Sequence, residues 1–133
     1  MGDPTGKKSI LIVDDEASFR FSAGVALRRS GYRVTEAGDG KQALEKVLDA
    51  RERSDPFHLV VTDIRMPVSS GLELIDALKQ HGVSVPVCAI TCFGDKDLVC
   101  ELYGKGCRDH LEKPFEPEEL VERIGTILRR GEG

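Results

Sequence analysis

The residues of this chain that could carry chemistry are an acidic pair, a lone aspartate, a threonine and a lysine. They are Asp14, Asp15, Asp63, Thr91 and Lys113, widely separated along the sequence. Carboxylates that converge on one point repel each other unless a cation lies between them, and a hard divalent ion such as Mg²⁺ prefers their oxygen atoms. A lysine ammonium and a threonine hydroxyl suit the oxygens of a phosphoryl group. Together these residue types indicate a phosphoryl-transfer site with a carboxylate nucleophile.

Runs of apolar residues predict the strands that would bring these polar residues together. Such runs cover residues 9–13, 32–36, 58–62, 85–91 and 108–111. Several of them are almost continuously apolar, which is typical of parallel strands covered on both faces. Asp14, Asp63, Thr91 and Lys113 each stand at or just beyond the end of such a run. Because ligands of open parallel sheets bind outside the carboxyl ends of the strands, these side chains are expected to share one edge.

Amphipathic segments between the runs predict five helices. The first covers residues 16–30 with Phe19 in its apolar stripe, and the second begins at Asp39. The third follows a capping box at Ser70, the fourth is capped by Asp95, and the fifth begins with Pro117 and runs to residue 130. This alternation of strands and helices predicts an α/β fold, a (βα)5 doubly wound sheet of five parallel strands.

The composition limits the chain to a few classes of protein. Its 133 residues fit one domain, 40% of them are hydrophobic, and the net charge is −4. This balance disfavours disorder, a separate substrate domain and direct binding to nucleic acid, which needs clustered basic surface. No apolar run could span a bilayer and the first nine residues lack the apolar stretch of a signal peptide, so a cytoplasmic location is expected. The four cysteines lack CxxC spacing and are expected to be reduced thiols.

Four motifs give the chain a resemblance to a known family. Val-Asp-Asp-Glu at 13–16, Thr-Asp-Ile-Arg-Met-Pro at 62–67, Thr91 after an apolar strand and Glu-Lys-Pro-Phe at 112–115 occur in order, each at a predicted strand end. Together they resemble the receiver domain of two-component response regulators, across residues 8–130. The resemblance implies a flavodoxin-like strand order of 2-1-3-4-5. It leaves residues 1–7 as a flexible N-terminus and residues 131–133 as a tail or a remnant of cloning.

The resemblance also implies roles for the residues around the acidic cluster. Asp63 corresponds to the residue that accepts a phosphoryl group from a phosphohistidine of a sensor histidine kinase or a phosphotransfer protein. Asp15 matches the direct Mg²⁺ ligand, and Asp14 matches an acid that acts on the metal largely through water. The backbone carbonyl of Arg65 is expected to complete the protein ligands of the ion. Lys113 matches the lysine that contacts the carboxylate and later the phosphoryl group, and its bond to the following proline is expected to be cis.

A switch is a further implication of the resemblance. Thr91 matches the hydroxyl that moves toward the phosphoryl group after transfer, and this movement alters a surface formed by the fourth helix, the fifth strand and the fifth helix, about residues 95–130. That surface would control an effector domain or a downstream protein, and control of transcription is one candidate output. The same surface is also a candidate interface for a homodimer. The domain would act as a signalling switch rather than as a conventional enzyme, without binding nucleic acid or membrane itself.

Three further positions could tune this switch. The family usually has Tyr or Phe three residues before the lysine, where this chain has His110. A half-buried ring in the same place is one interpretation, and a pH-sensitive switch is the other. Arg65 and Phe93 each stand two residues after a site residue and flank the phosphoryl position in receivers. They would set the lifetime of the phosphorylated form, Arg65 by pairing with a phosphoryl oxygen and Phe93 by restricting water.

Two other functions compete with a phosphorylated switch. A flavodoxin-like flavin protein would need a Ser/Thr/Gly-rich loop after the first strand, but this chain has Asp14-Asp15-Glu16 there, which would repel a phosphate without a metal. A pseudo-receiver is a protein-interaction module that is never phosphorylated. It would be expected to lack Asp63, Lys113 or a member of the acidic pair, all of which are present.

Overall fold

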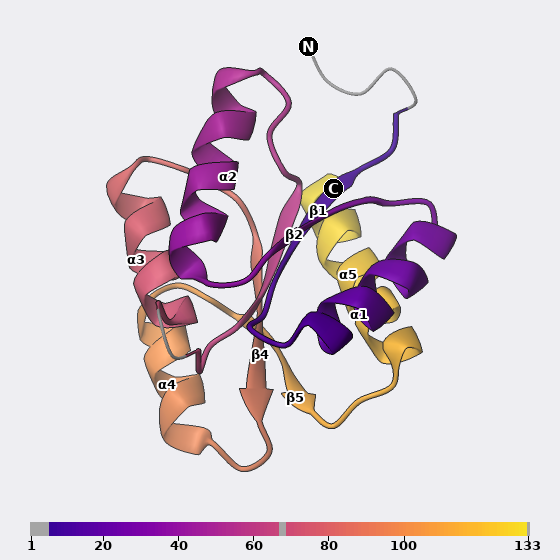
Figure 1. Ribbon diagram of the computed structural model, residues 1–133. Coiled ribbons are helices and arrows are strands. Elements are labelled where there is room, and N and C mark those ends of the chain that lie inside the picture. Colours follow the sequence, from indigo (N-terminus) through magenta and orange to yellow (C-terminus); the bar gives the residue numbers. More distant parts are fainter. Residues whose placement is uncertain (1–5, 67–68, 133) are drawn as a thin grey trace.

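The computed structural model describes residues 6–66 and 69–132. Pro67 of the second motif, most of the expected flexible N-terminus and the last residue of the expected tail lie outside these ranges. Within them, strands and helices alternate along the chain (Figure 1). The strands are β1 (Ser9–Val13), β2 (Arg33–Ala37), β3 (Leu59–Asp63), β4 (Val87–Cys92) and β5 (Asp109–Lys113). The helices are α1 (Ala17–Arg29), α2 (Gly40–Glu52), α3 (Gly71–Gln80), α4 (Lys96–Gly104) and α5 (Pro117–Glu132).

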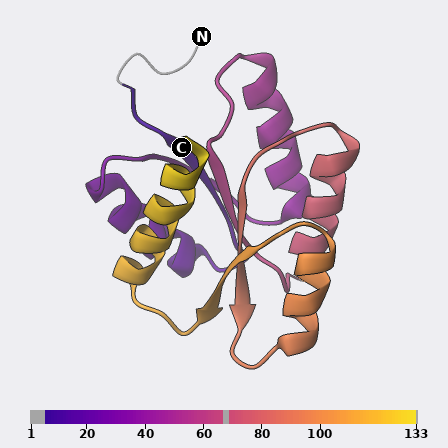
Figure 2. The same cartoon turned by 180° about the vertical axis from the view of Figure 1, so that it is seen from behind.

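The strands form one parallel sheet, which confirms the predicted fold. Their order is β2-β1-β3-β4-β5, the flavodoxin-like order. Helices α1 and α5 cover one face of the sheet, and α2, α3 and α4 cover the other (Figures 1 and 2). Because all strands run the same way, their carboxyl ends lie at one edge. Asp63 at the end of β3 pairs with Ile90 of β4, and Lys113 at the end of β5 pairs with Cys92 of β4.

Alternate residues of the central strands divide the core into two layers. Ile10 and Ile12 of β1 pack with buried residues of α1 and α5. Leu11 and Val13 of the same strand pack with residues of α2 and α3 on the opposite face. All four side chains are buried, as expected of a parallel strand with helices on both sides. The apolar runs of the sequence are therefore continuous because both faces of each central strand are covered.

The predicted elements and the observed ones differ mainly at their ends. β4 begins at Val87 rather than at residue 85, because Pro86 has no N–H to give to the sheet, although its carbonyl accepts from Val60 at 3.0 Å. Helix α5 continues to Glu132, two residues beyond its expected end. β3 and β5 include Asp63 and Lys113 as their last residues instead of ending before them.

Three predicted helix caps are confirmed by hydrogen bonds. The Asp39 carboxylate accepts from the backbone N–H of Gln42 at 2.9 Å, and the Ser70 hydroxyl accepts from Glu73 N–H in a complete capping box. The Asp95 carboxylate accepts from Leu98 N–H at 3.3 Å. The four cysteines are free thiols, and of these Cys88 and Cys107 are packed in the interior, whereas Cys92 and Cys100 are exposed rather than packed. Across the described ranges, no helix combines the length and the apolar character that crossing a bilayer requires.

Candidate functional site

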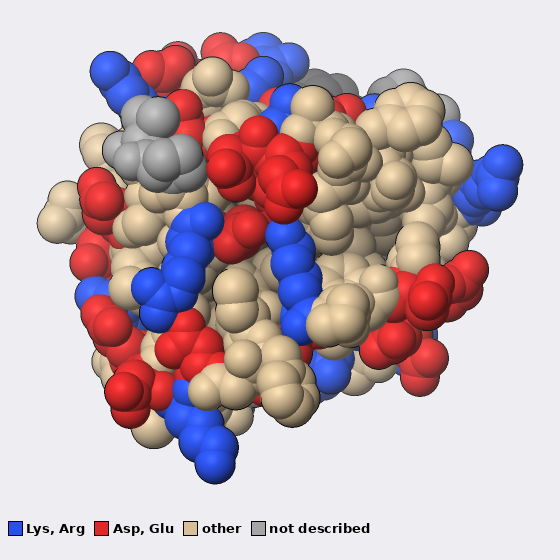
Figure 3. All heavy atoms as spheres, turned by 60° about the horizontal axis from the view of Figure 1, so that its bottom comes forward, with Lys and Arg blue, Asp and Glu red and all other residues tan. Residues whose placement is uncertain are grey.

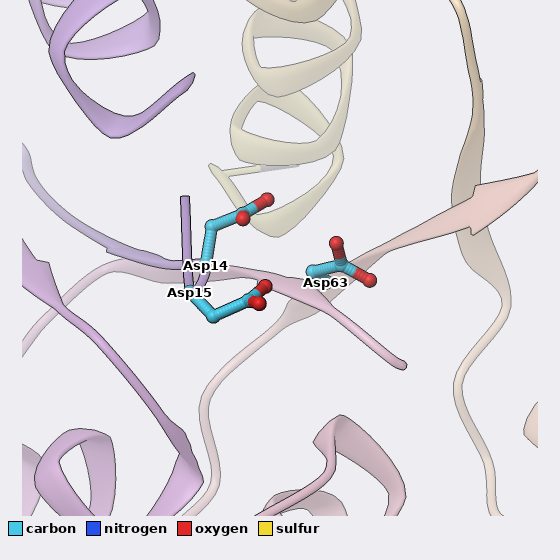
Figure 4. Close-up of side chains that lie close together, drawn as sticks. All are labelled: Asp14, Asp15 and Asp63. Atoms are coloured by element: carbon cyan, nitrogen blue, oxygen red, sulfur yellow. The ribbon is translucent and has the colours of Figure 1, made fainter. Parts of the chain in front are cut away.

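Three carboxylates meet at the carboxyl edge of the sheet. Asp14 and Asp15 directly follow β1, and Asp63 ends β3, the strand beside it. Figure 4 shows the three side chains close together, with the carboxylates of Asp14 and Asp15 directed toward Asp63, and one oxygen atom of each lies within 4.8 Å of the others. Seen onto this edge, acidic side chains gather at the centre of the face with basic side chains beside them (Figure 3). The structure therefore brings together the acidic residues that the sequence placed at separate strand ends.

Asp14 is the most deeply placed of the three acids, with none of its surface exposed. Its Oδ1 accepts from the backbone N–H of Glu16 at 2.9 Å, and its Oδ2 accepts from Lys113 Nζ at 3.3 Å. Its carbonyl oxygen accepts from the guanidinium of Arg20 at 2.6 Å. These contacts compensate a buried charge that would otherwise be costly. They also occupy both oxygens of the Asp14 carboxylate, whereas Asp15 is exposed to solvent.

Lys113 reaches the acidic cluster from β5. Its Nζ lies 3.2 Å from Asp63 Oδ2, 3.3 Å from Asp14 Oδ2 and 3.7 Å from a Glu16 oxygen. Burial alone would lower the pKa of Lys113, but the Asp14 and Asp63 carboxylates outweigh burial and hold that pKa above its ordinary value. The ammonium is therefore charged at neutral pH. The peptide bond between Lys113 and Pro114 is cis, as expected.

Asp63 is held by contacts on both of its carboxylate oxygens. The backbone N–H of Arg65 donates to Oδ1 at 3.0 Å, and Lys113 donates to Oδ2 at 3.2 Å. Burial raises the pKa of Asp63 above its ordinary value, Lys113 opposes this, and the Asp14 carboxylate adds to it. The side chain thus lies in a polar but partly desolvated site, between one ammonium and two other carboxylates.

The backbone at Asp63 also touches the start of α3 closely. Gly71, the first residue of α3, donates its N–H to the carbonyl of Ile64 at 3.0 Å. A Cβ at Gly71 would lie 2.7 Å from the carbonyl oxygen of Asp63, closer than side chains normally approach. The absence of a side chain at this position therefore lets α3 pack directly against the strand end that carries Asp63.

Thr91 lies in β4, the neighbour of β3, one position beyond the residue that pairs with Asp63. Its side chain is 3% exposed, and among the residues that the structure describes its Oγ1 has no hydrogen-bond partner. Buried hydroxyl groups are nearly always paired, so the Thr91 hydroxyl has the capacity for one further hydrogen bond next to the strand end that carries Asp63.

The side chain of Arg65 has a partner in the structure, while its expected pairing with a phosphoryl oxygen stays a prediction. Its side chain forms an ion pair with Asp95, with Nε 2.9 Å from Oδ2. Asp95 thereby serves two partners, because it also caps α4. The sequence identified Asp95 as a helix cap, but no local pattern could pair it with an arginine thirty residues away. The guanidinium thus links the loop after β3 to the start of α4.

The two candidates with ring side chains, Phe93 and His110, both lie near β4, one directly after it along the chain and the other in the strand beside it. Phe93, in the loop after β4, is 81% exposed. His110 is a half-buried residue of β5 whose neighbour in β4 is Ala89, and its carbonyl accepts from the guanidinium of Arg123. His110 is thus an intermediate position between core and surface, and both interpretations of its role stay predictions.

One contact at the site was missed because it depends on the fold. The Nζ of Lys113 lies over the ring of Phe19, 4.6 Å from its centroid. Phe19 belongs to α1, and the sequence placed it only in the apolar stripe of that helix. A lysine at a strand end and an aromatic residue early in a helix are common, so their distance along the chain gave no signal of this contact.

Proteins of known role match this chain over nearly its whole length. It is 38% identical to the phosphate regulon transcriptional regulatory protein PhoB of Pseudomonas aeruginosa, over 92% of this chain and 52% of that protein. It is 39% identical to the alkaline phosphatase synthesis transcriptional regulatory protein PhoP of Bacillus subtilis, over 94% of this chain and 50% of that protein. The chain therefore spans about half the length of the curated relatives it matches.

Solved structures and a family model agree with these relatives. The chemotaxis protein CheY4 of Vibrio cholerae superposes with a TM-score of 0.83 at 30% identity, covering 92% of this chain and 99% of that one. The model of the response regulator receiver domain matches residues 10–125. This match includes every member of the acidic cluster and Lys113. The chain belongs to the response regulator receiver domain family, the signalling modules of two-component systems.

Proposed function

We propose that this chain accepts a phosphoryl group on Asp63 from a phosphohistidine of a sensor histidine kinase or a phosphotransfer protein, in a Mg²⁺-dependent reaction. The observation that carries the proposal is the set of charges around Asp63. Lys113 Nζ lies 3.2 Å from its Oδ2, and the oxygens of Asp14 and Asp15 lie within 4.8 Å. This acidic triad is typical of the magnesium site of receiver domains.

The donor atoms of the cluster fit a hard divalent ion. Asp15 is exposed and can bind the ion directly, whereas Asp14 is fully buried beneath the surface of the site. Asp14 would therefore contribute mainly through a water molecule, and Asp63 and the backbone carbonyl of Arg65 would supply further oxygen ligands. When bound, the ion offsets the negative charge of the phosphoryl group and helps to orient it.

The chain's own residues would then position and neutralise the transfer. An oxygen of Asp63 attacks phosphorus, the phosphorus–nitrogen bond of the donor breaks, and the electron pair remains on the imidazole nitrogen. The Nζ of Lys113 donates a hydrogen bond to Asp63 Oδ2, and its positive charge would offset the negative charge of the phosphoryl oxygens. The N–H of Arg65 fixes the other Asp63 oxygen, so the carboxylate does not rotate freely. The product is an aspartyl phosphate.

Phosphorylation would be read through Thr91. Its buried hydroxyl would donate to a phosphoryl oxygen, and the movement would bias the surface of α4, β5 and α5 between two arrangements. That surface would act on an effector domain or a downstream protein. One way for it to do so is to form a homodimer through α4, β5 and α5. Because similar proteins are named transcriptional regulatory proteins, control of transcription is the output we favour.

The test is to incubate the purified chain with phosphoramidate, a small donor with a phosphorus–nitrogen bond, and to measure intact mass. With Mg²⁺ we expect the mass of one phosphoryl group to be gained, and with EDTA in place of Mg²⁺ we expect little gain. Asp63→Asn should abolish the gain, whereas Asp97→Asn, in the first turn of α4, should preserve it. No gain in the unaltered chain, or an equal gain in Asp63→Asn, would overturn the proposal in favour of an unphosphorylated interaction module.

A further inference from the structure

We infer that Phe19 is a positioning residue that holds the Lys113 ammonium over the acidic cluster through a cation–π contact. The Nζ of Lys113 lies 4.6 Å from the centroid of the Phe19 ring, well inside the range of that interaction. Phe115 meets the same ring edge to face, with centroids 5.9 Å apart and planes at 87°. The inference rests on the proposed function, because it concerns how Lys113 is prepared for phosphoryl transfer.

Lys113 needs such a support because its other partners change during the reaction. In the structure it is attracted by Asp14, Glu16 and Asp63, all within 3.7 Å. A divalent ion at the carboxylates would offset much of that negative charge, and phosphorylation of Asp63 would replace one carboxylate partner by phosphoryl oxygens in new positions. The negative face of the Phe19 ring is unaffected by either event. It is therefore a constant attraction on the ammonium while the charges of the site are redistributed.

The cavity beside the Phe19 ring offers the Lys113 side chain an alternative orientation. A cavity of about 390 Å³ lies between α1 and the loop from β5 to α5, and its lining includes Phe19, Phe115 and Lys113. Lysine has a long flexible stem that could reach into such a space instead of the acidic cluster. The Phe19 ring, braced by Phe115, occupies one side of this cavity. The Phe19 ring thus favours the orientation of Lys113 in which its ammonium is hydrogen-bonded to the Asp63 carboxylate.

The decisive experiment replaces Phe19 with mono-, di- and trifluorophenylalanine in the full chain. Successive fluorines weaken the negative ring face while nearly preserving its size. We expect the rate of phosphorylation by phosphoramidate at saturating Mg²⁺ to fall stepwise, by roughly two- to fivefold in total. The midpoint of thermal unfolding should stay constant across the series. The same series at Phe21, which is exposed on α1 and makes no ring contact with Lys113 or Phe19 in the described part of the chain, should leave the rate unchanged.

A second readout does not depend on phosphorylation. The fluorine NMR signal of monofluorophenylalanine at position 19 should move when Lys113→Met removes the cation, and the same label at position 21 should move less. A flat rate series at position 19, an equal decline at position 21, or an unmoved signal at position 19 would each overturn the inference. If the unaltered chain gains no phosphoryl group, the proposed function fails, but the fluorine signal still decides whether the contact exists.

Discussion

Replacing Gly71 with alanine should destabilise the fold and slow phosphorylation of Asp63 at the same time. Gly71 is buried at the start of α3, directly against the end of β3. An added Cβ would lie 2.7 Å from the carbonyl oxygen of Asp63 and 2.9 Å from the Cα of Ile64. Both are backbone atoms, so no change of side-chain rotamer can relieve the overlap. Either α3 or the strand end must move.

The expected size of both effects follows from that overlap. To reach the 3.4 Å of ordinary contact, the Cβ and the Asp63 oxygen must separate by about 0.7 Å. Overpacking of this kind costs about 1–3 kcal/mol, and the better helix propensity of alanine returns at most about 1 kcal/mol. A 1 Å misplacement at a reacting group can cost about 100-fold in rate, so a shift of this size should cost on the order of tenfold.

The assay combines urea unfolding followed by circular dichroism with phosphorylation by phosphoramidate. Gly104→Ala is the matched control, because a Cβ at Gly104, the last residue of α4, meets no described atom within 4 Å. That variant should gain up to about 1 kcal/mol of stability and keep the full phosphorylation rate. If Gly71→Ala matched Gly104→Ala in both measurements, the close packing of α3 on the Asp63 backbone would not control the site, and the reasoning would be wrong.

Three other perturbations test separate parts of the structure. Asp15→Asn should raise the thermal unfolding midpoint in EDTA, since it removes repulsion within the acidic cluster, yet it should lose the rise that Mg²⁺ gives the unaltered chain. Arg65→Ala should change the half-life of the phosphorylated form, measured by phosphate release, more than the rate at which that form appears. The reason is that the guanidinium of Arg65 pairs with Asp95 and not with Asp63 before phosphorylation. Burial, with the nearby Lys8 and Arg33 charges, lowers the pKa of His58, whose Nδ1 accepts from Ser9 N–H at 2.9 Å. As the pH falls, His58 becomes protonated in the unfolded chain before it does so in the folded chain. The free energy of unfolding should therefore decline below pH 6.5 and level off below the folded-state pKa of His58. Urea unfolding measured from about pH 8 to about pH 5 should show a smaller decline in His58→Asn.

The sequence was sufficient for the fold because the strands carry an unusually clear pattern. The continuous apolar residues of β1 and β3 require cover on both faces, and that requirement already implies parallel strands with helices between them. Once the strands are parallel, their carboxyl ends must share an edge, so the sequence alone predicts that Asp14, Asp63 and Lys113 meet. Element ends were less certain, because sheet pairing can extend through a polar residue such as Lys113.

The contacts that escaped prediction are those that depend on the angle and distance between separate elements. Arg65 and Asp95 each had a local interpretation, one beside Asp63 and the other as a helix cap, and neither interpretation required the other residue. Phe19 likewise satisfied the apolar stripe of its helix before its contact with Lys113 was considered. Local patterns identify what a residue can do, but the packing of α1 and α4 on the sheet decides which of these roles is used.

Among the described residues, the buried Oγ1 of Thr91 has no hydrogen-bond partner, and this bears on the balance between alternative arrangements of the domain. A buried polar group without a partner raises the free energy of the state that contains it by about 1–3 kcal/mol. An arrangement in which that hydroxyl finds an acceptor gains this much over one in which it does not, which corresponds to roughly a 5- to 150-fold shift in the equilibrium between the two. If Asp63 is phosphorylated as proposed, a phosphoryl oxygen at the edge of the sheet would be such an acceptor, and phosphorylation would favour the arrangement that pairs the hydroxyl by up to this factor.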